Sequence, residues 1–355
     1  MALNPNLLKN IRQVVPYVAG EQPQEKVMKL NTNENPYPPA PGVQKVLKEM
    51  DAGRFCLYPD PESVQLTKVL ADYHGIEEEQ VFVGVGSDDV LAMCFMTFFN
   101  SKKPILFPDI TYSFYKVWAE LFGVAYVSPT LDDDFKIKRE DYYHSNGGII
   151  FPNPNAPTGI YEDLDFVRDI LDRNPDVIVI VDEAYIDFAG ISAVELIRQY
   201  DNLIVVQTFS KSRSMAGMRI GYAMANATLI AYLNDVKHSF NSYTMNVTSQ
   251  VCAVAAVQDE LYFRETINKV VETREWFQKE LKKLGFEMTE SKANFVFVTH
   301  PHDSAASIFQ ALKKEKIFVR HWSADRICAY LRISIGTREE MEVLLQTLEA
   351  QYGQS

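Results

Sequence analysis

Short apolar runs alternate with segments of helical periodicity along most of the chain. The apolar runs predict buried strands, at Val81-Val83, Ile105-Phe107, Ala125-Val127, Gly148-Phe151, Val177-Val181, Leu203-Val206 and Ile220-Met224. Helical patterns lie between several of them, at about residues 87–99, 112–122, 162–173 and 192–200, and two more precede the first strand, at about 43–50 and 62–74. Strands that alternate with helices are typical of an α/β domain in which helices sandwich a mostly parallel sheet.

The pattern differs at the two ends of the chain. Seven prolines within the first 41 residues favour an extended N-terminal arm over a packed layer. Towards the C-terminus, short strand patterns separate long helical ones, which indicates a smaller α+β unit; the strands are expected at 294–298, 317–320 and 330–334 and the helices at 246–257, 261–284, 304–315 and 337–350. We therefore divide the chain into an arm (1–40) that packs with the small domain, a large domain (41–240) that holds the ligand, and a small C-terminal domain (241–355).

Composition and charge narrow the classes of partner. Of the 355 residues, 47% are apolar and 23% are charged, and the net charge is −12. The sequence contains no basic run of the kind that binds nucleic-acid phosphates or an anionic membrane. No apolar stretch reaches the ~20 residues needed to span a bilayer. Four scattered cysteines without CxxC spacing, and the lack of a secretory signal pattern, predict a reduced, cytoplasmic protein. His300 and His302 flank a proline in a predicted loop, so we expect a surface turn and no metal site.

One lysine stands out at the end of a predicted strand. Lys211 follows the apolar run Leu203-Val206 and lies among hydroxyl side chains, Thr208 and Ser210, with Arg219 eight residues further on. In open α/β sheets, ligands bind outside the carboxyl ends of the strands. A partly buried lysine amine beside other cations can act as a nucleophile and form a Schiff base with a carbonyl group. The alternative is a solvated lysine at a strand end.

A carboxylate ends another predicted strand. Asp182 follows the wholly apolar run Val177-Val181, and a buried carboxylate needs a partner. The partner could be a protonated ring nitrogen, because such an ion pair makes a heteroaromatic cofactor a better electron acceptor. Alternatively, Asp182 could cap the N-terminus of a helix, where aspartate is a favoured residue.

A glycine-containing turn offers a phosphate site. In Gly84-Val-Gly-Ser-Asp88, the backbone N–H groups of Ser87 and Asp88 would lie at the N-terminus of the following helix, where phosphates bind. The turn lacks the third glycine of the dinucleotide fingerprint and the Lys-Ser/Thr pair of the ATP loop. A monophosphate is the simpler ligand, and Arg219, Ser210 and Thr208 would complete the site.

Two further strand ends carry a ring and an amide. Tyr112, in Asp109-Ile-Thr-Tyr112, could lie flat against a bound ring or belong to the core. The turn Phe151-Pro-Asn-Pro-Asn-Ala-Pro-Thr-Gly159 is rich in proline, so its backbone is fixed. The amide of Asn155 could therefore point at a ligand, or the turn could simply be a rigid loop.

Taken in order, these stretches resemble the motifs of fold-type-I pyridoxal-phosphate-dependent aminotransferases, and in particular those of the histidinol-phosphate subgroup. The resemblance covers nearly the whole chain, in Asn33-Glu-Asn-Pro36, Tyr58-Pro-Asp-Pro61, Gly84-Val-Gly-Ser-Asp-Asp89, Pro108-Asp-Ile-Thr-Tyr112, Pro154-Asn-Ala-Pro-Thr-Gly159, Asp182-Glu-Ala-Tyr185, the segment from Thr208 to Tyr222, and Leu331-Arg-Ile-Ser-Ile-Gly-Thr337. It implies pyridoxal 5′-phosphate as cofactor and transamination of L-histidinol phosphate with 2-oxoglutarate in histidine biosynthesis. It also implies a homodimer with a shared active site.

The resemblance assigns a role to each motif. Lys211 would bind the cofactor covalently and act as base, Asp182 would pair with the ring nitrogen, and Tyr185 would hydrogen-bond the phenolic oxygen. Tyr112 would stack on the ring. The cofactor phosphate would be bound by Ser87, Asp88, Ser210 and Arg219, with Tyr58 reaching across from a second subunit.

For the substrate, the resemblance assigns anion binding to Arg320 and Arg332, and places Tyr17 and Asn33 in the arm that closes over the site. Two arginines on neighbouring strands suit a dianion better than a carboxylate. The chain departs from the family at one place. Ala156 stands before the Pro-Thr-Gly triplet, where the family has an asparagine that contacts the phenolic oxygen, and Asn155 lies one residue earlier.

Other functions fit parts of the same pattern. An aromatic amino-acid aminotransferase, or a decarboxylase of amino-acid phosphates, would use the same cofactor residues. A non-catalytic module that binds a small phosphorylated ligand would explain the glycine-containing turn, but it gives Lys211 and Asp182 no role.

Overall fold

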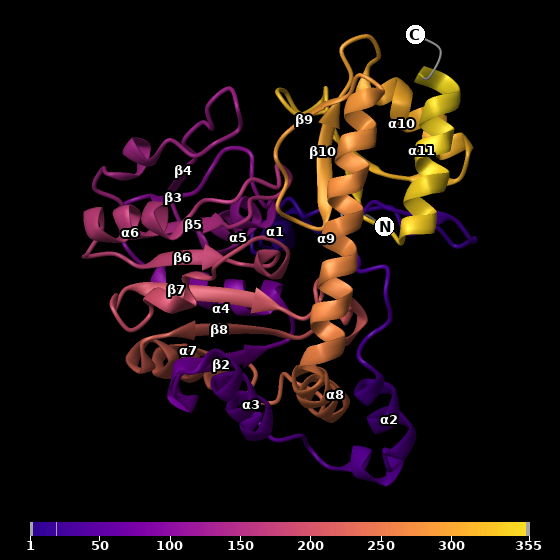
Figure 1. The fold of residues 1–355 in the computed structure, drawn as a ribbon. Helices are drawn as coiled ribbons and strands as arrows, with labels where there is room; N and C mark the ends of the chain where they lie inside the picture. Colours follow the sequence, from indigo (N-terminus) through magenta and orange to yellow (C-terminus); the bar gives the residue numbers. More distant parts are fainter. Residues whose placement is uncertain (1–2, 19, 353–355) are drawn as a thin grey trace.

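A seven-stranded sheet forms the core of the larger part of the molecule (Figure 1). The computed structural model describes residues 3–18 and 20–352. In spatial order the strands are β2 (Val81–Gly84), β8 (Gly221–Ala225), β7 (Leu203–Thr208), β6 (Val179–Asp182), β5 (Ile149–Pro152), β3 (Ile105–Leu106) and β4 (Tyr126–Val127). Only β8 runs against its neighbours β2 and β7, and the other pairs are parallel. The predicted α/β class with a mostly parallel sheet is confirmed.

Both faces of this sheet are buried under helices, so its strands are apolar on both sides. Successive residues of a strand point to opposite faces. In β6, Val179 and Val181 face one layer of helices and Ile180 faces the other. The first layer contains α2 (Pro41–Glu49), α3 (Val64–His74), α6 (Leu164–Arg173) and α8 (Val247–Gln258), and the second contains α4 (Ser87–Phe98), α5 (Phe114–Phe122) and α7 (Ala227–Phe240). Burial on both sides explains why the strands appear in the sequence as continuous apolar runs.

The smaller part of the molecule is an antiparallel sheet covered by helices. Its strands, in spatial order, are β12 (Arg320–His321), β13 (Leu331–Ser334), β10 (Phe295–Thr299) and β9 (Glu287–Met288). The helices are α9 (Glu260–Lys283), α10 (Ala305–Lys314) and α11 (Arg338–Tyr352), which bury apolar side chains against β10 and β13. In Figure 1, α9 runs from the edge of the large sheet into this smaller unit.

The N-terminal segment contacts both parts of the molecule. A short helix, α1 (Pro5–Leu8), opens the described chain, and β1 (Met28–Lys29) pairs in parallel with β11 (Ile317–Phe318) of the smaller unit. Between them, the Tyr17 ring stacks on Phe114 of α5, with ring centroids 4.3 Å apart. The arm therefore crosses the junction between the two sheets.

Several local predictions need correction. The segment predicted as a helix at 192–200 contains a 3₁₀ turn, at Ala193–Leu196, and no α-helix. The strand predicted at 317–320 is two strands, β11 and β12, which pair in different sheets. Helix α8 lies beyond residue 240, where we divided the domains, and yet it packs against α2 and α3 of the large sheet.

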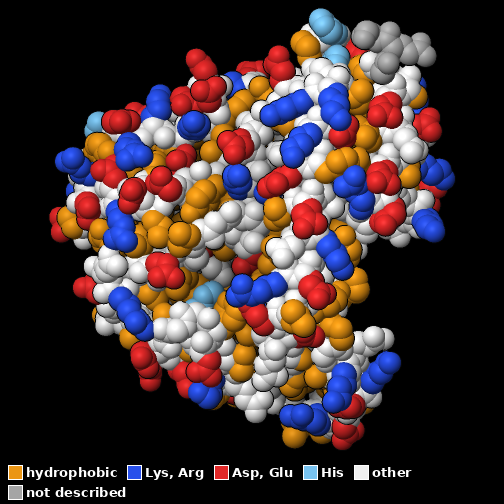
Figure 2. All heavy atoms as spheres, viewed as in Figure 1, with side chains coloured by type: hydrophobic (Ala, Val, Ile, Leu, Met, Phe, Trp, Pro, Cys, Tyr) orange, Lys and Arg blue, Asp and Glu red, His pale blue; other side chains and the backbone are white. Residues whose placement is uncertain are grey.

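Charges of both signs are mixed on the surface. On the face drawn in Figure 2, Lys and Arg side chains are interspersed with Asp and Glu, and no broad basic area is visible there. Within the described residues, no helix combines the length and the hydrophobicity needed to cross a membrane. Even α9, with 24 residues, carries charged side chains along its length.

Arg274 on α9 joins the two parts of the molecule from the inside. Its side chain is 2% exposed, and its Nη1 donates to the carbonyl oxygens of Phe188 and Ala293, at 3.0 Å each. Arg274→Met would preserve the volume but leave both carbonyls unpaired, so we expect the free energy of unfolding to fall by about 3 kcal/mol. The midpoint of urea unfolding measures this loss. Arg264→Met, on an exposed turn of the same helix, is the control, and an equal loss in both variants would contradict the role of Arg274.

Candidate active site

Four strands that run in the same direction bring the predicted site residues to one edge of the large sheet. β6 ends at Asp182, β7 ends at Thr208 just before Lys211, β5 leads into the turn that carries Asn155, and β2 leads into α4 at Ser87. Because carboxyl ends of parallel strands meet at one edge, segments far apart in the sequence lie together there. This is the edge at which the N-terminal arm crosses the molecule.

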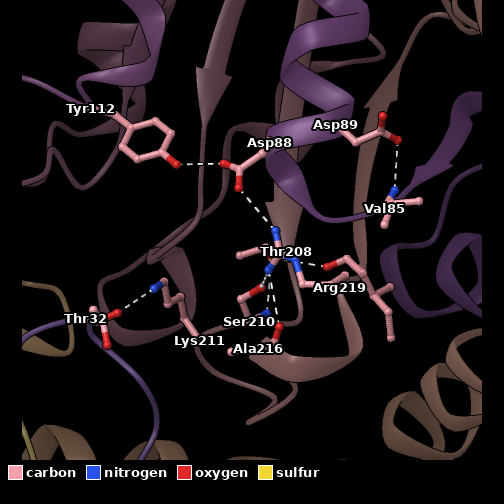
Figure 3. Close-up of polar contacts among 11 residues, drawn as sticks. Thr32, Val85, Asp88, Asp89, Tyr112, Thr208, Ser210, Lys211, Ala216 and Arg219 are labelled. Atoms are coloured by element: carbon pink, nitrogen blue, oxygen red, sulfur yellow. Dashed lines mark hydrogen bonds and ion pairs between the residues drawn. The ribbon is translucent and has the colours of Figure 1, made fainter. Parts of the chain in front are cut away.

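Lys211 lies against the arm. Its Nζ donates to the carbonyl oxygen of Thr32 at 3.0 Å (Figure 3) and lies 5.8 Å from the centroid of the Tyr185 ring. The Asn35 amide donates to the carbonyl oxygens of Lys211 and Ser212, at 3.1 Å each. The arm thus fixes the backbone of the lysine and also occupies its amine.

Asp88, Tyr112 and Arg219 form one hydrogen-bonded group at the start of α4 (Figure 3). The Asp88 carboxylate accepts from the hydroxyl of Tyr112 at 2.6 Å and from Nη2 of Arg219 at 3.1 Å. Arg219 Nη1 also donates to Oγ of Ser210 at 3.2 Å, and Thr208 Oγ1 donates to the same oxygen at 3.0 Å. Five of the residues predicted to bind the cofactor therefore lie together.

Glycines allow the backbone to approach Arg219 closely. Gly86 has a φ of +86°, and a Cβ at this position would lie 2.5 Å from Nη2 of Arg219. A Cβ at Gly221 would overlap the backbone nitrogen of Ser87. The first N–H groups of a helix have no partner within the helix, so the start of α4 and the guanidinium together suit an anion.

Asp182 is 3% exposed and accepts two hydrogen bonds from neutral donors. Oδ2 accepts from the hydroxyl of Tyr115 at 2.8 Å, and Oδ1 accepts from the N–H of Ala184 at 3.2 Å. Burial raises the pKa of Asp182 to about 6, although both hydrogen bonds oppose the shift. The next helical turn is a 3₁₀ turn that begins at Ile186, so Asp182 caps no α-helix. A cationic ligand group would stabilise the ionised carboxylate.

Tyr185 is connected to the smaller sheet through the arm. Its hydroxyl accepts from the Asn33 amide at 3.0 Å. The Asn33 N–H donates to Oγ of Ser334 on β13 at 2.9 Å, and the same hydroxyl donates to the Asn33 side-chain oxygen at 3.0 Å. Asn33 has a left-handed backbone, with a φ of +56°, which asparagine tolerates better than most residues. Asn33 therefore orients Tyr185.

Asn155 is engaged within its own turn. Its side-chain oxygen accepts from the hydroxyl of Thr111 at 3.0 Å, and its amide donates to the carbonyl oxygen of Ile110 at 3.0 Å and to Oγ1 of Thr158 at 3.1 Å. Both donor hydrogens of the amide are thus used inside the protein. The side chain holds the turn against the segment before Tyr112.

A cavity of about 480 Å³ lies beside these residues. Its wall includes Tyr17 of the arm, Tyr112 and Ala156 from the large sheet, and Arg320 and Arg332 from the smaller sheet. Tyr112 belongs both to this wall and to the group around Asp88. Through Tyr112 the cavity adjoins the group around Asp88.

Two arginines face each other across neighbouring strands in this cavity. Arg320 and Arg332 are paired residues of β12 and β13, so their side chains share one face of the sheet. The Trp322 ring lies 5.5 Å from one guanidinium carbon and 5.4 Å from the other. Arg332 Nη2 donates to the carbonyl oxygen of Asn31 at 3.0 Å, and its buried Nε has no hydrogen-bond partner within residues 3–18 and 20–352. Burial lowers the pKa of Arg332, and an anion would reverse that shift.

Tyr58 is the predicted site residue that lies apart from the others in a single chain. Its side chain is 82% exposed and stacks on Tyr243, with ring centroids 4.7 Å apart. Its hydroxyl would have to reach a site in another molecule to play the role that the resemblance implies.

Reasoning from the sequence missed Tyr115 and Trp322. Tyr115 lies three residues after Tyr112 at the start of α5, and this spacing puts both side chains on the same side. Trp322 follows Arg320 by two residues in an extended segment, which also favours one face. Both spacings were available as signals, but each residue looks like an ordinary core aromatic in isolation.

Comparison with known proteins gives consistent matches over most of the chain. A family model described as aminotransferase class I and II matches residues 25–348. The chain is 50% identical over 341 residues to the histidinol-phosphate aminotransferase of Lactococcus lactis subsp. cremoris, covering 96% of each protein. Two solved structures share its fold: histidinol-phosphate aminotransferase from Clostridium acetobutylicum (TM-score 0.85, 24% identity, 93% of this chain and 100% of that chain) and the enzyme of that name from Sinorhizobium meliloti in complex with pyridoxal-5′-phosphate (TM-score 0.82, 23% identity, 92% of each).

Buried Asp182 should make the stability of the ligand-free protein depend on pH. Its folded-state pKa of about 6 exceeds the usual 3.8, so between these values the folded protein holds a proton that the unfolded chain has lost, and stability falls as pH rises. We expect Asp182→Asn to raise the free energy of unfolding at pH 8 by about 3 kcal/mol in protein freed of any bound ligand. The gain should vanish towards pH 4, as measured by urea unfolding across this range.

Asp176→Asn is the matched control for this prediction, because Asp176 is exposed. It should behave like the wild type at every pH. An equal gain for Asp182→Asn at pH 4 and pH 8 would show that the ionised carboxylate is not the cause.

Proposed function

The chain belongs to the class I and II aminotransferase family, and from that premise we propose that it transfers the amino group of L-histidinol phosphate to 2-oxoglutarate, with pyridoxal 5′-phosphate as cofactor. The products are imidazole acetol phosphate and glutamate, a step of histidine biosynthesis. The observation that carries the choice of substrate is the pair Arg320 and Arg332 in one cavity, because two guanidinium groups on one face suit a phosphate dianion.

The residues around Lys211 fit the cofactor. The lysine offers an amine for covalent attachment. Asp182 offers a buried carboxylate whose hydrogen-bond donors are neutral, which suits a protonated ring nitrogen. Arg219, Ser210 and the start of α4 suit the phosphate, and Arg219 has five N–H donors, so it can bind a phosphate and keep Asp88 as a partner. When bound, pyridoxal phosphate withdraws electrons from the carbon that bears the substrate amino group.

The protein supplies the proton transfer and the orientation. Lys211 Nζ is the base that takes the proton from that carbon. The carbonyl oxygen of Thr32 accepts a hydrogen bond from this amine and so holds it in position. Tyr185, oriented by Asn33, hydrogen-bonds the phenolic oxygen. Tyr112 is held edgewise against Tyr115, with ring centroids 5.7 Å apart, so its face is fixed for stacking on a ring.

Substrate selection follows from the cavity. The buried Nε of Arg332 and the guanidinium of Arg320 bind the phosphate of histidinol phosphate, and Tyr17 closes the side formed by the arm. When histidinol phosphate binds in this way, its imidazole lies towards Tyr112 and Ala156, where the wall is aromatic or small. When 2-oxoglutarate binds, one of its carboxylates takes the place of the phosphate.

A homodimer accounts for the exposed aromatic surface around Tyr58. Phe55, Leu57 and Tyr58 are 55%, 71% and 82% exposed, and Tyr243, which stacks on Tyr58, is 47% exposed. Exposed apolar side chains in such density mark an interface. A second copy of the chain covers them and receives Tyr58 at its phosphate site. We also propose a cytoplasmic location, where the four free cysteines would stay reduced.

The absorption spectrum tests the function directly. The purified protein should show the visible band of bound pyridoxal phosphate, and histidinol phosphate added without an oxo acid should bleach it. Lys211→Ala should lose this band and nearly all turnover, because the anchor and the base are the same atom. Lys68→Ala, which removes an exposed lysine of α3 that pairs with Asp72, is the control and should retain both.

Other outcomes of this experiment separate the alternatives. A band that bleaches with phenylalanine but not with histidinol phosphate would favour an aromatic aminotransferase. Release of carbon dioxide from threonine phosphate would favour the decarboxylase. Absence of any band in the wild type would favour a non-catalytic binding module.

Arg320→Met should impair the phosphorylated substrate most. We expect kcat/KM for histidinol phosphate to fall about a hundredfold, and that for glutamate in the reverse reaction to fall much less, since a monoanionic carboxylate can use Arg332 alone. Arg338→Met is the matched control, because Arg338 also lies over a tryptophan ring in the smaller part of the molecule, 3.5 Å from Trp276. Equal losses for both substrates would contradict phosphate binding by Arg320.

A further inference from the structure

The loop between β12 and β13, residues 322–330, forms one wall of the substrate cavity. Trp322, Arg326 and Ile327 of this loop line the cavity on the side of the smaller sheet. The facing wall, Pro108–Tyr112, belongs to the large sheet. The width of the cavity therefore depends on how this loop is held against the other half of the molecule.

Arg326 provides that attachment. Its Nη1 donates to the Asp109 carboxylate at 3.2 Å, and its Nη2 donates to the carbonyl oxygens of Leu131 and Asp132 at 3.0 and 2.7 Å. Its guanidinium carbon also lies 5.5 Å from the centroid of the Phe135 ring. All four partners lie on loops of the large sheet, so one side chain connects the two walls of the cavity.

The acceptors are themselves fixed in place. The other Asp109 oxygen accepts from the N–H groups of Ile110 and Leu131, at 2.9 and 3.0 Å. One carboxylate thus holds two loops of the large sheet together and presents a free oxygen to Arg326. Apolar side chains from both walls pack together beside this contact, in a cluster of Ile110, Leu131, Phe135, Phe297 and Ile327.

The backbone supports the same interpretation. Arg326 and Phe135 both have left-handed backbones, with φ of +66° and +62°, and neither is a glycine. Such conformations cost free energy and persist where surrounding contacts determine them, often at ligand clamps. Here the strained residues contact each other across the junction of the two sheets.

The loop also carries the ring that orders the substrate arginines. Trp322 lies four residues before Arg326, and its ring is within 5.5 Å of the guanidinium carbons of Arg320 and Arg332. If the loop moved away from the large sheet, this ring would move with it. The two arginines would then lose the contact that holds their side chains side by side.

We propose that Arg326 is a positioning residue for substrate binding, which latches the β12–β13 loop to the large sheet so that Trp322 and the two arginines form a closed anion site. The inference rests on the function proposed above for the same cavity. Without the latch, the closed loop is one state among several. The substrate then has to close it on binding, which raises KM and leaves kcat unchanged at saturation.

The kinetic test compares Arg326→Ala with Arg139→Ala. Arg139 is a matched control within the large sheet domain, since it pairs with Asp169 at 3.8 Å and lies 5.3 Å from the Phe166 ring, but it joins no two walls of the cavity. We expect KM of the Arg326 variant to rise about tenfold with kcat within twofold of the wild type. Arg326→Lys, which can reach one acceptor but not all three, should give an intermediate KM. The amino donor is whichever one the wild type turns over, so failure of histidinol phosphate as donor would refute only the proposed substrate.

Amide hydrogen exchange gives a readout that does not depend on activity. In the cofactor-loaded protein, Arg326→Ala should speed exchange in residues 322–330 and in 131–135 together, while Arg139→Ala should speed exchange in neither. Unchanged exchange in these segments, or the same rise in KM in both alanine variants, would overturn the proposal.

Discussion

Asn33 is hydrogen-bonded to both halves of the molecule at once, and the geometry of the site depends on that junction. Its amide donates to Tyr185 at the edge of the large sheet, and its backbone N–H and side-chain oxygen pair with Ser334 of the smaller one. The adjacent residues repeat the pattern, because the carbonyl oxygen of Thr32 accepts from Lys211 and that of Asn31 accepts from Arg332. The amine proposed to act as the base and the arginine proposed to bind the substrate are thus positioned by consecutive residues of one short segment.

Two adjacent carboxylates, Asp182 and Glu183, are buried at the end of β6. Glu183 accepts hydrogen bonds from Ser192, from the N–H of Ala193 and from Gln207, and burial raises its pKa to about 7. Asp182 points to the other side of the chain and accepts only two, both from neutral donors. Burial raises the pKa of both carboxyl groups, so the hydrogen bonds offset the desolvation of neither completely. Glu183 has three donors within the protein and Asp182 has two, which leaves Asp182 more open to a cationic ligand group.

The sequence predicted most elements of the fold, because burial on both faces of a sheet leaves a direct trace in apolar runs. It also predicted that chemistry would gather at strand ends. It did not predict β1 or β9, two-residue strands whose pairing depends on partners far along the chain, since periodicity reports burial and not contacts. Nor does periodicity show the role of Arg213, whose guanidinium carbon lies 3.8 Å from the centroid of the Phe263 ring and whose Nη1 donates to the carbonyl oxygen of Ala256, so that it anchors the segment after Lys211 to α8.

The two arginines of the cavity favour a negatively charged ligand. Arg320 and Arg332 are held side by side although like charges repel, and burial of Arg332 adds a desolvation cost. Trp322 and the carbonyl oxygen of Asn31 offset part of this cost, but the Nε of Arg332 remains unpaired within the described residues. A dianion offsets the repulsion and pairs that donor in a single step, whereas the single charge of a carboxylate offsets it only in part. This difference supports a phosphorylated substrate over an aromatic amino acid of similar shape.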